Sequence, residues 1–222
     1  MLLTASDLEY APSTLTFIRL ALDASKGDLD VRKYPVLRGP LAKLPLLAQK
    51  GNPDALTLAG ELALRKNDIP GALLKFNQAI KAAATQGDGA FAPAPTRMDI
   101  ISGRHLEPPQ RKPRWAMESR CHIQRGRLLL ERGDRADAEA AFRIAATELD
   151  VATGCLELAK LLPVGSSDRE SYLLKAIASG ITEAHSLLML DLSKGKPTDS
   201  LLWGGDQRED QKWINELHRM AK

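Results

Sequence analysis

The side chains best suited to catalysis or metal binding are histidines and cysteines, and they are scattered along the chain. The four histidines are His105, His122, His185 and His218. None of them has the short spacing that places two ligands around one metal ion. Cys121 and His122 are adjacent, so on a helix their side chains point about 100° apart. Cys155 follows Cys121 by 34 residues, which predicts equivalent packing positions on neighbouring helices rather than a redox or zinc pair.

Motifs of the common enzyme classes do not occur in the chain. Gly204-Gly205 is followed by Asp206, without the lysine of a phosphate-binding loop. There is no Gly-x-Ser-x-Gly nucleophile elbow. The carboxylates are spread over surfaces that the hydrophobic pattern predicts to face solvent. We therefore expect a protein that is not an enzyme and that uses no metal or cofactor.

Arginine is concentrated between residues 97 and 135. This segment has ten basic and five acidic residues, a net charge of +5, whereas the whole chain has +3. A guanidinium group pairs with a carboxylate or phosphate through two parallel hydrogen bonds. The basic segment therefore indicates either a solvated face with internal ion pairs, or a surface for an acidic protein segment or RNA. Since only Phe91 and Trp115 lie nearby for base stacking, protein is favoured over RNA.

The composition is that of a helical globular protein. Of 222 residues, 44% are hydrophobic and 27% charged, but only 5% are aromatic. Alanine and leucine favour helices, and no run of alternating β-branched residues predicts a strand. No apolar stretch approaches the roughly 18 residues of a membrane span. The two cysteines are too few for a disulfide framework.

Hydrophobic periodicity and capping residues predict helices along most of the chain. The predicted helices are 13–25, 41–50, 53–66, 70–85, 115–132, 135–148, 151–162, 167–179, 182–193 and 206–221. Residues 87–114 contain five prolines, so we expect them to form one long loop. Pro45 restricts the second helix to short turns or a kink.

Two predicted helix pairs share a spacing pattern. The first pair contains Gly60, Ala72, Phe76 and Ala79, and the second contains Gly126, Ala138, Phe142 and Ala145. Each residue of the second set follows its counterpart by 66 positions. This offset is close to two repeats of about 34 residues, so the long loop occupies the place of one repeat.

These residues resemble the tetratricopeptide repeat, in which a small residue on the first helix lets the second helix approach closely. Lys175-Ala176-Ile177-Ala178-Ser179-Gly180, followed by Ala184, resembles the repeat end of the Sel-one-like subclass. The resemblance implies an all-α fold, a right-handed α-α superhelix of antiparallel helix pairs. Residues 1–222 would form a single helical-repeat domain. Repeats would cover 44–86 and 115–193, separated by the loop at 87–114, and 206–222 would be a C-terminal capping helix.

The resemblance also implies a concave groove lined by the first helix of each pair. By register, its predicted partner-binding residues are Glu61, Leu64, Arg120, Ile123, Arg127 and Leu130. The basic face adds Arg104, Arg111, Lys112 and Arg114. The Lys and Asn clamp that some family members use for chaperone carboxylates is replaced by Thr57 and Glu61, or by Ile123 and Arg127, which disfavours that partner class.

The leading hypothesis is a non-catalytic scaffold or adaptor that binds a protein partner. Two alternatives are an RNA-binding helical-repeat protein and a structural subunit of a larger assembly, for example a mitochondrial one. We expect an intracellular setting, cytoplasmic or mitochondrial. The partner and the oligomeric state stay open.

Overall fold

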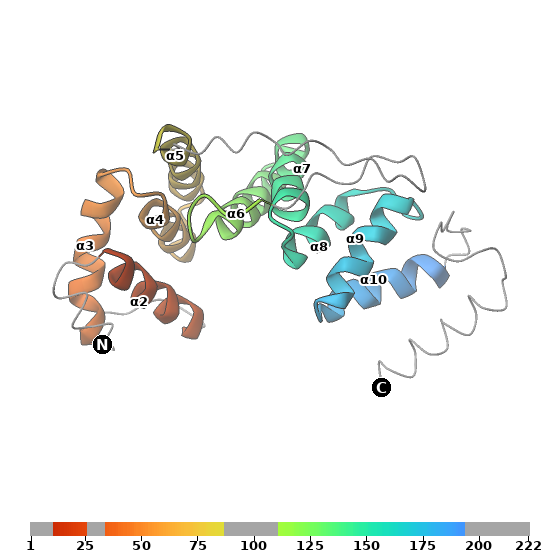
Figure 1. Cartoon of the computed structure of the whole chain (residues 1–222), viewed down its shortest axis with the longest axis horizontal. Helices are drawn as coiled ribbons and strands as arrows, with labels where there is room; N and C mark the ends of the chain where they lie inside the picture. The colour runs from red at the N-terminus through yellow and green to blue at the C-terminus, as the bar shows by residue number, and fades with distance from the viewer. Residues whose placement is uncertain (1–10, 26–33, 87–110, 194–222) are drawn as a thin grey trace.

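A computed structural model describes residues 11–25, 34–86 and 111–193 of the chain. Within these ranges the fold is entirely helical, without a strand. Figure 1 shows the helices following one another along the long axis in chain order. The helices α2 and α3 lie at one end of this row, and α9 and α10 at the other. The predicted loop over 87–114, apart from residues 111–114, and the predicted capping helix over 206–222 lie outside the described residues.

The observed helices correspond closely to the predicted ones. Their bounds are α2 Ala11–Ala24, α3 Arg38–Gln49, α4 Pro53–Arg65, α5 Ile69–Gln86, α6 Glu118–Glu131, α7 Arg135–Arg143, α8 Ala152–Leu161, α9 Ser167–Ala178 and α10 Thr182–Ser193. Two short elements complete them, a 3-10 turn at Pro35–Leu37 and a π-helical turn at Ile144–Glu148. Each helix packs on the next one along the chain, with the closest pairs α4 with α5, α6 with α7, and α8 with α9.

The hairpins α4–α5 and α6–α7 have the same turn. Asp68 N–H donates to Ala63 O at 2.9 Å in the first, and Asp134 N–H donates to Leu129 O at 2.9 Å in the second. The residue before each aspartate has a positive φ, 59° at Asn67 and 87° at Gly133. All these positions differ by 66, so the spacing found in the sequence corresponds to one repeated backbone geometry.

The glycine of each hairpin lies directly under a phenylalanine. A Cβ added to Gly60 would lie 2.6 Å from Phe76 Cε1, and one added to Gly126 would lie 2.5 Å from Phe142 Cε1. Real Cβ contacts are not this short, so only glycine allows the two helices to approach this closely. Both phenylalanines are completely buried.

The turns that separate successive hairpins also share a form, with one exception. Gly51 and Gly180 have φ values of 76° and 83°. The residue after each glycine donates its backbone N–H to an earlier carbonyl at 3.1 Å, Asn52 to Leu47 O and Ile181 to Ala176 O. After α7 the π-helical turn adds one residue, so the positive φ moves to Asp150. The turn after α7 is therefore one residue longer than the other two, and Val151 N–H donates to Ala145 O at 2.9 Å.

Two helix boundaries differ from the prediction. The helix α3 begins at Arg38 and continues through Pro45, where we predicted irregular chain and short turns. Proline removes one backbone donor, but its ring contributes apolar surface to a groove described below. The helix α6 begins at Glu118 rather than at Trp115, because the Glu118 side chain accepts the backbone N–H of Arg114 and holds the preceding turns.

The two cysteines are buried packing residues, as their spacing predicted. Cys121 is 0% exposed and Cys155 is 1% exposed, and both are free thiols. Cys121 Sγ donates a weak hydrogen bond to Phe76 O on α5, and Cys155 Sγ donates one to Ala146 O in the π-helical turn after α7. Burial raises the pKa of Cys121 to about 12, so its thiol stays protonated and unreactive.

Candidate functional site

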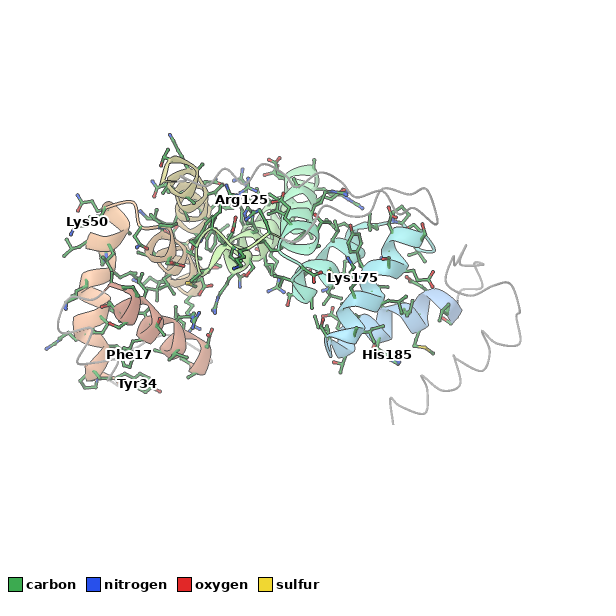
Figure 2. All side chains as sticks on the ribbon, viewed as in Figure 1. Phe17, Tyr34, Lys50, Arg125, Lys175 and His185 are labelled. Atoms are coloured by element: carbon green, nitrogen blue, oxygen red, sulfur yellow. The ribbon has the colours of Figure 1, made fainter. Side chains whose placement is uncertain are left out.

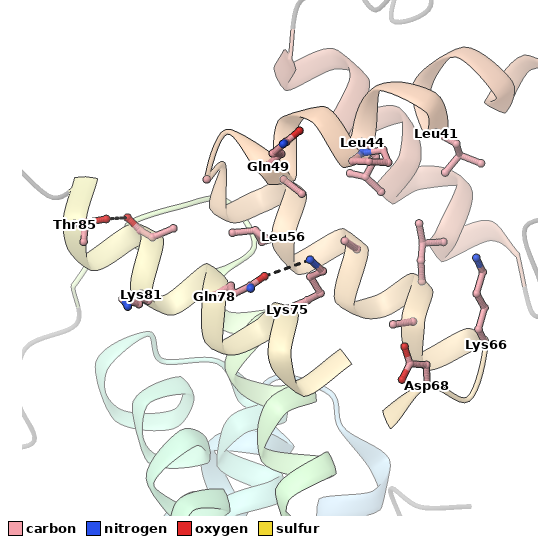
Figure 3. A pocket seen from close by; sticks show the side chains of 17 residues that line it. Leu41, Leu44, Gln49, Leu56, Lys66, Asp68, Lys75, Gln78, Lys81 and Thr85 are labelled. Carbon is pink, nitrogen blue, oxygen red and sulfur yellow. Dashed lines mark hydrogen bonds between the residues drawn. The ribbon is translucent and has the colours of Figure 1, made fainter. Parts of the chain in front are cut away.

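An open groove lies between α3 and α5, with α4 as its floor (Figure 3). Its cavity volume is about 1030 Å³. In Figure 3, α3 and α5 run in the same direction and α4 runs back between them. Leu41 and Lys66 lie at one end of the groove, and Gln49 and Thr85 lie at the other. We call this feature the α3–α5 groove.

Each of the three helices gives one face to the groove. The lining positions recur at intervals of three and four residues, the spacing of a single helical face. They are Leu41, Leu44, Pro45, Ala48 and Gln49 on α3, Leu56, Ala59, Leu62 and Ala63 on α4, and Lys75, Gln78, Lys81, Ala82 and Thr85 on α5. Gly51, Lys66 and Asp68 complete the lining. The floor and the α3 wall are therefore apolar, and the α5 wall is polar and basic.

The charge around the groove is positive. Neither α3 nor α5 contains an acidic residue. Lys66, Lys75 and Lys81 line the groove, and none of them forms an ion pair with the residues that the structure describes. The one acid of the lining, Asp68, accepts the Gly71 N–H at 2.9 Å at the start of α5.

The two acids of the floor helix α4 serve other contacts. Asp54 Oδ1 accepts the backbone N–H of Met117 at 2.8 Å. Glu61 is buried and accepts from Arg120, and burial raises the pKa of Glu61 despite that contact. The carboxylates of α4 are therefore engaged by Arg120 on α6 and by the backbone N–H of Met117 before it, rather than by the lysines of the groove.

Several predicted binding residues instead hold the helices together. Arg120 on α6 donates to Glu61 on α4 and to Asp23 Oδ1 on α2 at 2.5 Å, so one side chain joins three helices. Arg127 on α6 donates to Glu157 Oε1 on α8 at 2.6 Å. These acids neutralise the two arginines that we expected to meet an acidic partner or an RNA backbone.

The predicted first-helix groove is only partly open. The side chains of Glu61 and Ile123 are buried, 5% and 8% exposed, and their role in partner binding stays a prediction. Leu64 is half-buried and packs against the core. Leu130 remains exposed. The sequence register does not include the neighbouring helices that cover Glu61 and Ile123.

The segment before α6 contains three more of the predicted residues. Arg111 makes a two-fold contact with Glu118, Nη1 to Oε2 at 2.9 Å and Nη2 to Oε1 at 2.7 Å, and its Nε donates to Glu148 Oε2 at 2.7 Å. Arg114 Nε donates to Glu118 Oε1 at 3.0 Å. Lys112 is exposed, and Arg104 lies outside the described residues. A partner-binding role for these four residues stays a prediction.

Glu118 is the centre of this cluster. Its side chain has no exposed surface. Burial alone would raise the pKa of Glu118, but the hydrogen bonds from Arg111 and from the Arg114 backbone hold it below its ordinary value. The carboxylate is therefore charged at neutral pH, and it fastens residues 111–117 to the start of α6.

Beside Glu118 lie two buried side chains whose ring nitrogens have no hydrogen-bond partner among the residues that the structure describes. These are Trp115 at Nε1 and His122 at both Nδ1 and Nε2. The rings are 6.3 Å apart and tilted by 42°. Burial lowers the pKa of His122 to about 4, although the nearby Glu118 opposes the shift. His122 is thus a neutral packing residue of α6 at physiological pH.

We expect His122 to make the protein less stable in mild acid. The unfolded chain binds a proton near the ordinary pKa of 6.5, whereas the folded chain does so only near 4. Stability is therefore lost as the pH falls below 6.5, by up to about 1.4 kcal/mol per pH unit. Urea unfolding between pH 7 and 5 measures this slope for the protein and for His122→Leu. An unchanged slope in the variant would contradict the assignment.

The α3–α5 groove is the feature that sequence reasoning missed. The signal was present as two helical segments, 38–49 and 69–86, with four basic residues and no acidic one. The segment 97–135 has the stronger sequence signal, because it contains more basic residues per length.

Among the arginines of 97–135, Arg125 (Figure 2) pairs with the neutral Asn77, Nε to Oδ1 at 2.7 Å, rather than with an acid.

In ranges 11–25, 34–86 and 111–193, no three His, Cys, Asp or Glu side chains gather where they could hold a metal ion. In the same ranges, no helix combines the length and hydrophobicity that crossing a membrane requires.

Comparisons with known proteins give no match. No protein-family model, no curated protein and no solved structure is significantly similar to the chain. The function of the groove therefore has to be inferred from its residues.

Proposed function

We propose that this protein is a non-catalytic interaction scaffold, and that the α3–α5 groove is its binding site for a protein partner. In this proposal the helix pairs form a right-handed solenoid of tetratricopeptide type, Sel-one-like subclass. The equivalent turns and glycine–phenylalanine contacts of α4–α5 and α6–α7 support the repeat assignment. They do not depend on the long loop between the two hairpins.

The groove itself carries the functional proposal. It combines about 1030 Å³ of open volume with an apolar floor and lysines that have no carboxylate partner among the described residues. A partner would cover apolar surface and neutralise the lysines at the same time. The first-helix surface is less suited to binding an acidic partner, because Arg120 and Arg127 already have acidic partners within the chain.

Filling the groove is expected to abolish partner binding. Ala59 lies on the floor, so Ala59→Phe would place a ring in the groove. Ala140, exposed on α7, offers a matched control, Ala140→Phe. The tagged full-length protein and both variants would be purified from the cells that express them, and circular dichroism would verify that each variant is folded.

The proposal predicts a partner that is retained by the wild type and by Ala140→Phe but lost by Ala59→Phe. Such a loss is expected to exceed about tenfold, because an added ring in a packed contact costs on the order of 1–3 kcal/mol. An identical set of partners for all three proteins would contradict a binding role for the groove.

A further inference from the structure

We infer that the occupant of the α3–α5 groove is an acidic amphipathic helix of about three turns, with an apolar stripe facing α4 and carboxylates facing the lysines of the groove. This inference rests on the proposed function and specifies the partner chemistry of the same site. It places the partner between α3 and α5 and over α4, rather than on the surface that contains Arg120 and Arg127.

The length of the occupant follows from the walls. The lining residues run from Leu41 to Gln49 on α3 and from Lys75 to Thr85 on α5. At 1.5 Å per residue these faces are about 12 and 15 Å long. A helix of about eight to ten residues covers this length and presents apolar side chains at intervals of three and four. The apolar floor at Leu56, Ala59 and Ala63 has the same spacing and matches such a stripe.

A helix fits this groove better than an extended segment. All three surrounding elements are α-helices, and within them the backbone groups bond to one another. An extended segment would find no free row of backbone donors and acceptors along the walls, and its own polar groups would stay unpaired against the apolar floor. A helix satisfies its backbone internally and needs only side-chain contacts from the groove.

The charge of the occupant follows from the lysines. Lys66 lies at one end of the groove, while Lys75 and Lys81 lie along the α5 wall (Figure 3). Within the described parts of the chain, Lys75 Nζ meets a neutral acceptor and no acid, donating to Gln78 Oε1 at 3.3 Å. The acids of α4 are engaged on the other side, with Met117 and Arg120. A basic occupant would meet three uncompensated like charges, whereas glutamates beside an apolar stripe would pair with them.

The test uses three synthetic peptides of equal length with blocked ends and a fluorescent label. The first has leucines along one helical face and glutamates on both flanks. The second replaces every glutamate by lysine, and the third replaces every leucine by alanine. Fluorescence anisotropy would measure their binding to the full-length protein, to Ala59→Phe and to a variant with Lys66, Lys75 and Lys81 all changed to Glu.

We expect only the leucine–glutamate peptide to bind the wild type, at least about tenfold more tightly than either other peptide, and more weakly as salt rises. Ala59→Phe should lose this binding, and the triple lysine variant should prefer the lysine peptide. Equal affinity for the acidic and basic peptides, or a preference unchanged by the triple variant, would overturn the inference.

The two proposals fail in different ways. If none of the peptides binds but Ala59→Phe still loses a cellular partner, the acidic-helix inference is wrong and the groove remains the partner site. If Ala59→Phe keeps every cellular partner, the proposed function is wrong, and this inference falls with it.

Discussion

Replacing Glu118 by Ala is expected to lower the free energy of unfolding by about 3–5 kcal/mol, because it removes the acidic partner of a largely buried arginine. Glu118 has no exposed surface and accepts from both Arg111 and Arg114. Its loss would leave Arg111, whose side chain is only 16% exposed, with Glu148 as its remaining carboxylate. Urea unfolding followed by circular dichroism measures the effect.

The matched control for this experiment is Glu139→Ala. Glu139 also pairs with an arginine, Arg143, at 2.7 Å, but both side chains are well exposed. Exposed pairs of this kind contribute less than about 1 kcal/mol. If the Glu118 and Glu139 variants lost the same stability, the buried cluster would not fasten residues 111–117 to α6.

The second large effect concerns the two glycines under phenylalanine rings. Gly60→Ala and Gly126→Ala are each expected to destabilise the protein by about 1–3 kcal/mol, because the new methyl group would force the ring and its helix apart. The calculated approach is 2.6 Å at Gly60 and 2.5 Å at Gly126, so the two losses should be similar. Thermal and urea unfolding of the single variants would compare them.

Gly39 offers a control within the same fold. It lies in α3, and a Cβ at this position meets nothing within 4 Å. Gly39→Ala is therefore expected to change the free energy of unfolding by less than about 1 kcal/mol, because the gain in helix propensity in the first turn is opposed by the ring of the following Pro40. A second check is Phe76→Leu, which should reduce the cost of Gly60→Ala by making room. A Gly39 variant as destabilised as the Gly60 variant, or additive costs at Gly60 and Phe76, would contradict the close-approach argument.

The helical hairpins could be predicted from the sequence because their determinants are local. Gly60 and Phe76 are only 16 residues apart, and the turn at Asn67-Asp68 lies between them. The same holds for Gly126 and Phe142. The π-helical turn at Ile144–Glu148 could not be predicted in this way, since it depends on how that segment packs on α6 and α8.

The contacts of the arginines could not be predicted, because their partners are distant in the chain. Arg120 bonds to Asp23, 97 residues away, and Arg127 bonds to Glu157, 30 residues away. The sequence shows a net positive charge over 97–135, but it does not show that acids of α2, α4 and α8 pair with the arginines of this segment. The groove was missed for the same reason, because it is formed by faces of three helices that meet only in the folded protein.

The ion pairs of Arg120 and Arg127 and the α3–α5 groove indicate a division of roles between two surfaces of the fold. Arg120 and Arg127 connect α6 to its neighbours along the row. The groove side has apolar surface and lysines that the described parts of the chain leave unneutralised. A scaffold needs both, namely contacts that hold its helices in register and a surface that remains free for a partner.

Site-specific photo-crosslinking tests the central claim most directly. A photoreactive amino acid would replace Gln78, which lines the α3–α5 groove, or Leu130, an exposed residue of the first-helix surface. The full-length protein would be irradiated in its own cells, with and without Ala59→Phe. We predict a crosslinked partner at position 78 that disappears with Ala59→Phe, and none at position 130. A partner captured at position 130 and not at position 78 would contradict the account.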